Sequence, residues 1–194
     1  MALSILDPKT ALVLIDLQHG IVGMPTAPLT SAEVLGNSVK LADAFRAAGA
    51  PVVLVRVSFA PDFSDALPGR TESQGFGGVP PEGWDIIVDE LSGHPGDIRV
   101  TKHNWGAFHG TDLDVQLRRR GVTQIVLAGI STSIGVESTA RAAYEHGYNV
   151  TIATDAVTDS DADAHQNSLD RIFPRLGESG STEEVLELLA KTQG

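Results

Sequence analysis

The stretch QIVLAGISTSIGVES, residues 124–138, indicates the fold class of the chain. Its first part, 124–130, is a short run rich in Val and Ile, which is typical of a strand buried on both faces of a parallel sheet. A polar turn follows, and the spacing of apolar residues predicts a helix over 133–146 that ends before Gly147. A strand that runs through a turn into a helix is the repeating unit of α/β proteins.

The rest of the chain repeats this unit. Similar apolar runs, with one weaker example at 97–101, predict further strands over 11–15, 51–57 and 149–154. Helical spacing predicts helices over 31–48, 112–120 and 182–191. Because strand and helix alternate and a glycine ends three of the helices, we expect a right-handed three-layer α/β sandwich. The length of 194 residues predicts a single domain over 1–194.

Composition limits the functions that such a domain could have. The chain carries 25 acidic and 14 basic residues, a formal net charge of −11, and it contains no cysteine. This acidic balance opposes nonspecific binding to nucleic acid or to anionic membranes. The absence of cysteine excludes disulfides, thiolate metal sites and thiol catalysis. With neither a long apolar run nor a secretory signal pattern, we expect a cytoplasmic protein that acts on a small molecule.

One segment, 60–83, interrupts the alternation because it holds four Pro and five Gly with little periodicity. It is either a tolerated surface insertion or a loop that covers substrate, since long loops in compact domains are often functional.

Polar residues follow several of the predicted strands, at the sheet edge where open α/β sheets bind ligands. The first strand is followed by Asp16, the weaker strand by Lys102, and the strand at 149–154 by Asp155. A lysine ammonium near a carboxylate keeps it charged, whereas apolar surroundings raise its pKa, so Asp16 and Lys102 together would make an acid–base pair. Taken singly, Asp16 is equally a helix cap or a buried aspartate, and Lys102 a surface lysine.

The turn at 131–135 is the fourth such feature. Backbone N–H groups at a helix start suit an anion or a developing oxyanion. Simple helix capping by Thr132 or Ser133 explains the same residues equally well. The chain contains none of the phosphate-loop, dinucleotide or G-x-S-x-G motifs, and its six histidines are scattered, so we expect no metal and no cofactor.

Three motifs, found at 10–18, 101–113 and 126–141, closely resemble those of the isochorismatase-like hydrolases in order and separation. This cysteine hydrolase superfamily includes nicotinamidases and N-carbamoylsarcosine amidohydrolases. The resemblance implies a Rossmann-type, six-stranded parallel sheet of order 3-2-1-4-5-6 with helices on both faces. It also implies that Asp16 and the 131–135 turn share one crevice, and that the protein is a homodimer or a larger homo-oligomer.

In the amidase branches of this superfamily, an Asp takes the proton of a Cys thiol, a Lys supports the charge, and the thiolate attacks a carbonyl. The resemblance places Asp16 and Lys102 at the first two positions and Gly135 at the nucleophile position. A covalent thioester is therefore impossible here. The resemblance also implies a cis peptide bond between Ile130 and Ser131.

True isochorismatases also have Gly at the nucleophile position. The resemblance to them implies that Asp16, as general acid, protonates the carbon of a vinyl ether, while Lys102 orients it and binds the substrate carboxylate. This chain departs from that branch in two ways. Ser131 replaces a tyrosine, and residues 136–139 have the sequence typical of the amidase branch. The metal-binding Asp-x-His of nicotinamidases is absent from 58–63.

The sequence thus predicts a hydrolase of a small, anionic metabolite with a vinyl ether or related C–O bond, working by general acid/base catalysis without a cysteine nucleophile. One alternative is a lapsed amidase-branch member that only binds a small molecule, and another is a serine hydrolase that uses Ser131 or Ser133. We expect substrate to contact residues near the strand ends and in the long loop, namely Gln18, Arg70, Gln74, Trp105, Phe108, Ser131 and Thr132.

Overall fold

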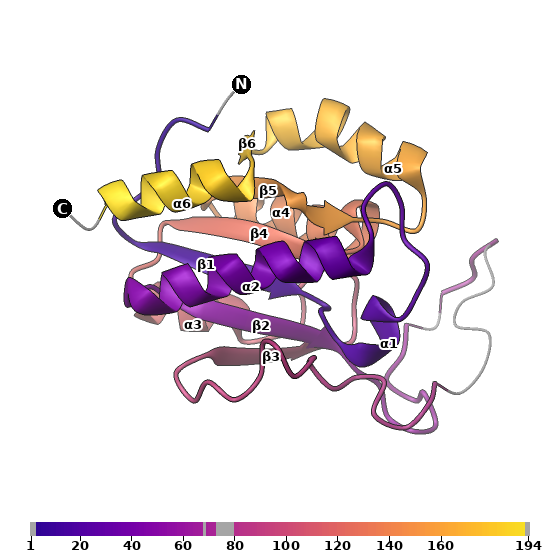
Figure 1. The fold of residues 1–194 in the computed structure, drawn as a ribbon. Coiled ribbons are helices and arrows are strands. Elements are labelled where there is room, and N and C mark those ends of the chain that lie inside the picture. The colour runs from indigo at the N-terminus through magenta and orange to yellow at the C-terminus, as the bar shows by residue number, and fades with distance from the viewer. Residues whose placement is uncertain (1–2, 68, 73–79, 193–194) are drawn as a thin grey trace.

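The computed structural model describes residues 3–67, 69–72 and 80–192. Its centre is a six-stranded sheet of order β3-β2-β1-β4-β5-β6 in which all neighbours are parallel, which confirms the predicted architecture (Figure 1). The strands are β1 (Thr10–Ile15), β2 (Val52–Val57), β3 (Ile98–Lys102), β4 (Gln124–Ile130), β5 (Asn149–Thr158) and β6 (Glu178–Gly180).

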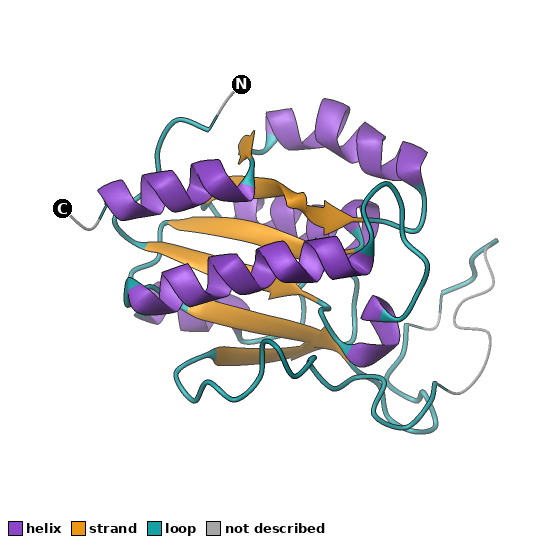
Figure 2. Cartoon of the chain, in the orientation of Figure 1, coloured by secondary structure: helices purple, strands orange, loops and turns teal. Residues whose placement is uncertain are grey.

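Helices cover both faces of this sheet (Figure 2). Helices α2 and α6 lie on one face, and α3 and α4 lie on the other (Figure 1). The helices are α1 (His19–Val22), α2 (Ser31–Ala47), α3 (Leu113–Arg119), α4 (Glu137–Glu145), α5 (Ala162–Asn167) and α6 (Thr182–Lys191). Helices α2 and α6 each begin with a capping box, in which a side-chain hydroxyl and a glutamate satisfy the first free amides. No helix of the described ranges is long and apolar enough to cross a membrane.

The core has two apolar layers, one on each face of the sheet. Strand β1 is buried over its whole length, and its side chains alternate between the layers. Ala11, Val13 and Ile15 pack in the layer that also holds Leu113 of α3 and Ala140 of α4. The intervening residues of β1 pack with side chains of α2 and α6. A strand without polar alternation thus stabilises the fold from both faces.

The predicted end of β5 is wrong. The strand continues to Thr158 instead of ending at 154, and its pairing with β4 shifts register between Leu127 and Gly129. Asp155 therefore lies inside β5, where its carboxylate accepts hydrogen bonds from the backbone and the hydroxyl of Thr182 at the start of α6. Asp159, the residue after the strand, takes the place at the sheet edge that we predicted for Asp155.

Further elements differ from the sequence-based prediction. The short strand β6 and the helices α1 and α5 had no periodic pattern that we used to predict them. The predicted helix over 133–146 begins as a π-helical turn, Thr132–Val136, and becomes α-helical at Glu137. This turn follows a cis peptide bond between Ile130 and Ser131, as the resemblance implied.

Candidate active site

Asp16 follows β1 directly and leaves the strand in an unusual backbone conformation. Its φ of 53° lies in the left-handed region, which non-glycine residues seldom adopt. Its amide donates to the carbonyl of Val55, so the residue is still anchored to the sheet. Strained backbone of this kind is found mainly at functional sites, where the surrounding structure maintains it.

Lys102, the last residue of β3, reaches the same point across the end of β2. Its Nζ lies 2.7 Å from Oδ2 of Asp16 and 3.1 Å from the carbonyl oxygen of Asn104. Both side chains are buried, with residue exposures of 6% for Asp16 and 2% for Lys102. The pair therefore lies in a region where water screens charge poorly.

Burial is the largest influence on the pKa of Asp16. Loss of water raises the pKa of Asp16 from an ordinary 3.8 to about 6, although the nearby Lys102 ammonium acts in the opposite direction. The second carboxylate oxygen, Oδ1, is buried and accepts no hydrogen bond from the part of the chain that the structure describes. A carboxyl group with these properties can both hold and release a proton near neutral pH, as an acid–base catalyst requires.

Gly135 lies against this carboxylate. An added Cβ at position 135 would lie 3.3 Å from Oδ2 of Asp16 and 2.9 Å from Cγ2 of Ile15. The structure thus brings Asp16, Lys102 and Gly135 together, in the arrangement that the resemblance implied for a carboxylate, an ammonium and a nucleophile position. Glycine contributes no side chain, so the polar groups that lie together at this point are the carboxyl group of Asp16, the ammonium of Lys102 and backbone groups of the turn.

A second glycine allows β1 and β4 to approach each other next to the site. Gly129 has a φ of +122°, and a Cβ there would lie 2.1 Å from the carbonyl oxygen of Ile15. Any side chain would therefore force the two strands apart just before Asp16 and the turn.

Two amides of the 131–135 turn already have acceptors within the protein. The Ser133 amide donates to Oδ2 of Asp159, and the Ile134 amide donates to the carbonyl of Ser131, as does the amide of Val136 just after the turn. The amides of Ser133 and Ile134 are therefore engaged within the protein, and an anion at this turn would have to meet other amides of 131–135.

The outer side of the turn is held by the segment that follows β5. Thr132 is completely buried, and its hydroxyl shares a 2.8 Å hydrogen bond with Nδ1 of His165 in α5. Burial lowers the pKa of His165, although the charge of Asp159 opposes this, so the imidazole is neutral at pH 7. His165 bonds to Thr132 and not to Ser131 or Ser133, which leaves the serine hydrolase interpretation without a histidine base.

Two of the predicted substrate contacts need correction. Gln18 is fully buried; its amide oxygen accepts from the Val57 amide and its nitrogen donates to the carbonyls of Val57 and Trp84. It therefore joins β1 to the neighbouring loops and has no free polar atom for substrate. Phe108 is also buried and packs against Tyr148 and His146, which lie just before the first residue of β5, whereas Asp16 lies at the carboxyl ends of the strands.

The other predicted substrate contacts differ in how far they are exposed. Trp105 is 62% exposed, and its carbonyl oxygen lies 3.5 Å from the point where a Cβ of Gly135 would be. Ser131 is half-buried in the turn, Thr132 is buried as described, and Arg70 is exposed in the long loop. Gln74 lies outside the described residues.

Sequence reasoning missed Thr139, a buried residue whose hydroxyl bonds to both the turn and the loop after Lys102. The signal that could have found it is its position one helical turn after Gly135, where a Thr hydroxyl can reach the earlier carbonyl. Among the described residues, no group of three or more His, Asp or Glu side chains is placed to hold a metal ion.

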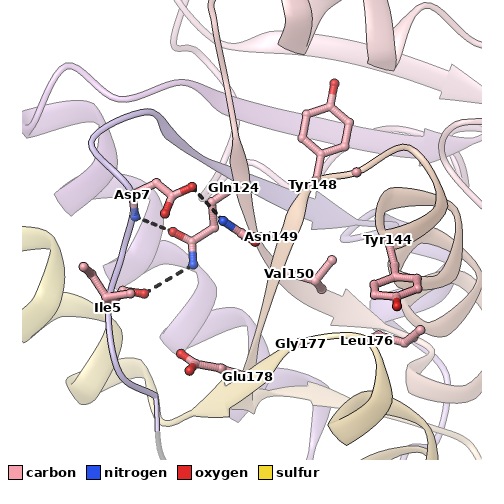
Figure 3. Close-up of a pocket in the computed structure, with 11 residues that line it drawn as sticks. Ile5, Asp7, Gln124, Tyr144, Tyr148, Asn149, Val150, Leu176, Gly177 and Glu178 are labelled. Carbon is pink, nitrogen blue, oxygen red and sulfur yellow. Dashed lines mark hydrogen bonds between the residues drawn. The ribbon is translucent and has the colours of Figure 1, made fainter.

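A separate cavity of about 390 Å³ lies at the opposite, amino-terminal edge of the sheet (Figure 3). Its polar side chains are largely bonded within the protein: Gln124 accepts from the Asp7 amide, and the Asp7 carboxylate accepts from Asn149 (Figure 3). Glu178 in turn accepts from the amide and hydroxyl of Ser4. These bonds fasten the N-terminal segment to the sheet.

Comparison with known proteins supports the fold and the motifs. The model of the isochorismatase domain matches residues 10–184. The chain is 48% identical to the isochorismatase family protein YecD of Escherichia coli O157:H7 over 93% of this chain and 96% of that one. It is 49% identical to the isochorismatase family protein YwoC of Bacillus subtilis over 92% of this chain and 93% of that one.

More distant relatives include amidohydrolases. The ureidoacrylate amidohydrolase RutB of Agrobacterium fabrum is 34% identical over 76% of this chain and 75% of its own. The crystal structure of N-carbamoylsarcosine amidase from Thermoplasma acidophilum superposes with a TM-score of 0.74 at 27% identity, covering 90% of this chain and 97% of that one.

An isochorismatase family protein from Burkholderia thailandensis has a more similar structure, with a TM-score of 0.91 and 47% identity over 96% of this chain and 98% of that one. The family match spans nearly the whole chain, and the sheet order and the motifs agree with it. The chain therefore belongs to the isochorismatase family, within the isochorismatase-like hydrolases.

Proposed function

We propose that this hydrolase cleaves a small, anionic metabolite at a vinyl ether or related C–O bond, by general acid/base catalysis and without a covalent enzyme intermediate. The observation that carries the proposal is the buried Asp16–Lys102 pair, with a carboxyl pKa of about 6, lying against a glycine that supplies no nucleophile. Acid–base chemistry is what this set of groups can perform.

In the proposed reaction, protonated Asp16 donates its proton to the terminal carbon of the vinyl ether. The ether oxygen shares the resulting positive charge as an oxocarbenium ion, while Lys102 stabilises the carboxylate left behind. Water adds to the cationic carbon and returns a proton to Asp16. The bond between the former vinyl carbon and the ether oxygen of the hemiketal then breaks, as the hydroxyl loses its proton and the leaving oxygen gains one. Substrate and one water thus give a ketone and an alcohol.

Substrate recognition would come from groups around this pair. Trp105, exposed beside Gly135, offers an apolar face, and the buried ammonium of Lys102 favours an anionic substrate group near Asp16. The amides of Thr132 and Gly135 are the proposed donors to a substrate carboxylate or to a developing oxyanion.

The test is turnover of a panel containing isochorismate, simple vinyl ethers, amides and ureides, followed by ketone and ammonia release. For any substrate found, Asp16→Asn should lower kcat by about 10²-fold or more. Asp89→Asn changes an exposed carboxylate after Val88 and should leave kcat unchanged. Full turnover by Asp16→Asn would refute the role of Asp16.

A second candidate function is suggested by the amidohydrolases among the relatives. In that case the chain is a former amidase that binds a ureide or amide without cleaving it. Because the protein has no cysteine, Gly135→Cys introduces a single thiol at the predicted nucleophile position. Amide or ureide hydrolysis that appears only in this variant would favour the second candidate.

A further inference from the structure

Two segments cover the buried Asp16–Lys102 pair. One is the turn that carries Gly135, whose Cβ position lies 3.3 Å from the Asp16 carboxylate. The other is the loop 104–107, which follows Lys102. The Asn104 carbonyl of this loop accepts a hydrogen bond from the Lys102 ammonium, and the Trp105 carbonyl oxygen lies 3.5 Å from the Cβ position of Gly135. Because burial raises the pKa of Asp16, a movement of these segments that admits water to the carboxylate should lower that pKa.

A single hydroxyl joins these two segments. Thr139, completely buried in α4, donates to the carbonyl of Gly135 over 2.6 Å and accepts from the amide of Ala107 over 3.0 Å. A bond from Thr to the carbonyl four residues earlier is common in helices. The second bond is a tertiary contact, in which a lone pair of the same hydroxyl oxygen accepts the Ala107 amide.

The loop and α4 are also in close contact beside this hydroxyl. A Cβ on Gly106 would lie 3.3 Å from the backbone and side chain of Ser138, so the loop backbone packs directly on the start of the helix. A continuous path therefore runs from Thr139 through Ala107 and Asn104 to the Lys102 ammonium and the Asp16 carboxylate.

We propose that Thr139 is a positioning residue: its hydroxyl holds the Gly135 turn and the 104–107 loop together over the Asp16–Lys102 pair. This role rests on the proposed function of that pair. The hydroxyl of Thr139 bonds to Gly135 and Ala107 and to neither member of the pair, so in this role it acts through the two segments that it joins.

The test measures the titration of the Asp16 carboxyl by ¹³C NMR in full-length protein. Thr139→Val keeps the shape of the side chain but removes the hydroxyl, and it should lower the Asp16 midpoint by about one pH unit or more as water reaches the carboxylate. Thr139→Ser keeps the hydroxyl and should leave the midpoint at the wild-type value. Urea unfolding of both variants gives their global stability for comparison.

A valine variant that loses stability while its Asp16 midpoint stays or rises would overturn the proposal, because Thr139 would then be only structural. If Thr139→Val does not fold, Gly106→Ala tests the same contact from the loop side, because the added methyl group pushes the loop 104–107 away from Ser138 in α4. This variant should also lower the titration midpoint of Asp16. The titration needs no substrate, so a failure here is distinct from failure of the proposed function, which is tested by turnover of the Asp16→Asn variant.

Discussion

Oδ2 of Asp16 and Nζ of Lys102 lie 2.7 Å apart although their strands, β1 and β3, are separated in the sheet by β2. The lysine side chain spans the end of the intervening strand, where Lys102 is in register with Val57. Because the Asp16 carboxyl group is buried, its charged form is stabilised chiefly by the nearby Lys102 ammonium.

The activity should depend on pH through Asp16. A general acid must be protonated, and the pKa of Asp16 is raised to about 6 by burial. For a vinyl ether substrate, kcat/KM should be constant well below pH 6 and fall about tenfold per pH unit well above it. A kcat/KM that instead rises through pH 6 would indicate that Asp16 acts as a base, as amide hydrolysis by activated water requires.

Removal of the ammonium should shift this titration upward. In Lys102→Met the attraction that lowers the pKa of Asp16 is lost while burial remains, so the carboxyl midpoint in ¹³C NMR should rise above the wild-type value. At pH 8, unfolding free energy should fall by about 3–5 kcal/mol because a buried charge has lost its partner. The loss should shrink at pH 5, where Asp16 binds a proton.

Lys40→Met is the control for this variant, since Lys40 is exposed on α2. It should change neither the Asp16 midpoint nor, by more than about 0.5 kcal/mol, the unfolding free energy. Equal losses of stability for the two lysine variants would contradict the assignment of a buried pair.

Two glycine-to-alanine substitutions should have opposite effects on stability. Gly135→Ala places a methyl group 2.9 Å from Cγ2 of Ile15, so we expect about 1–3 kcal/mol of destabilisation from overpacking. Gly36→Ala adds a methyl group within α2, where no atom lies within 4 Å, and should stabilise by about 0.5–1 kcal/mol. Urea unfolding of both variants measures the difference, and a stabilising Gly135→Ala would mean that the site is roomier than described.

His165 should make stability depend on pH near 6. Because burial lowers its pKa in the folded state, the unfolded chain binds more protons, and this contribution to stability is lost as pH falls below the ordinary value of 6.5. His165→Gln cannot titrate but can still bond to Thr132. The stability difference between wild type and variant should therefore shift against the wild type between pH 7 and pH 5.

Asp16 opposes this trend, since a raised carboxyl pKa makes the folded protein more stable as pH falls from about 6 toward 3.8. Comparing wild type with His165→Gln at each pH cancels the Asp16 contribution. A stability difference that does not vary with pH would show that His165 already titrates normally in the folded protein.

The sequence alone determined the order of the first five strands and of the four longer helices, because the spacing of apolar residues reflects local backbone geometry. Strands such as 124–130 are buried on both faces and need no knowledge of their neighbours to be predicted, and glycines 49, 121 and 147 mark helix ends in the same local way. The sequence also predicted the polar residues at the carboxyl ends of β1 and β3, and hence Asp16 and Lys102 as candidates.

Only the tertiary structure decided where those side chains point and what each one contacts. The shift in register within β5 put Asp155 beside α6 and Asp159 at the sheet edge, which depends on pairing with β4. Gln18 bonds to backbone groups that lie far along the chain, so its sequence position after Asp16 gave no sign of that role. Burial of Asp16, which raises its pKa, arises from segments that meet only when the sheet has formed, because desolvation depends on the surroundings in space and not on sequence neighbours.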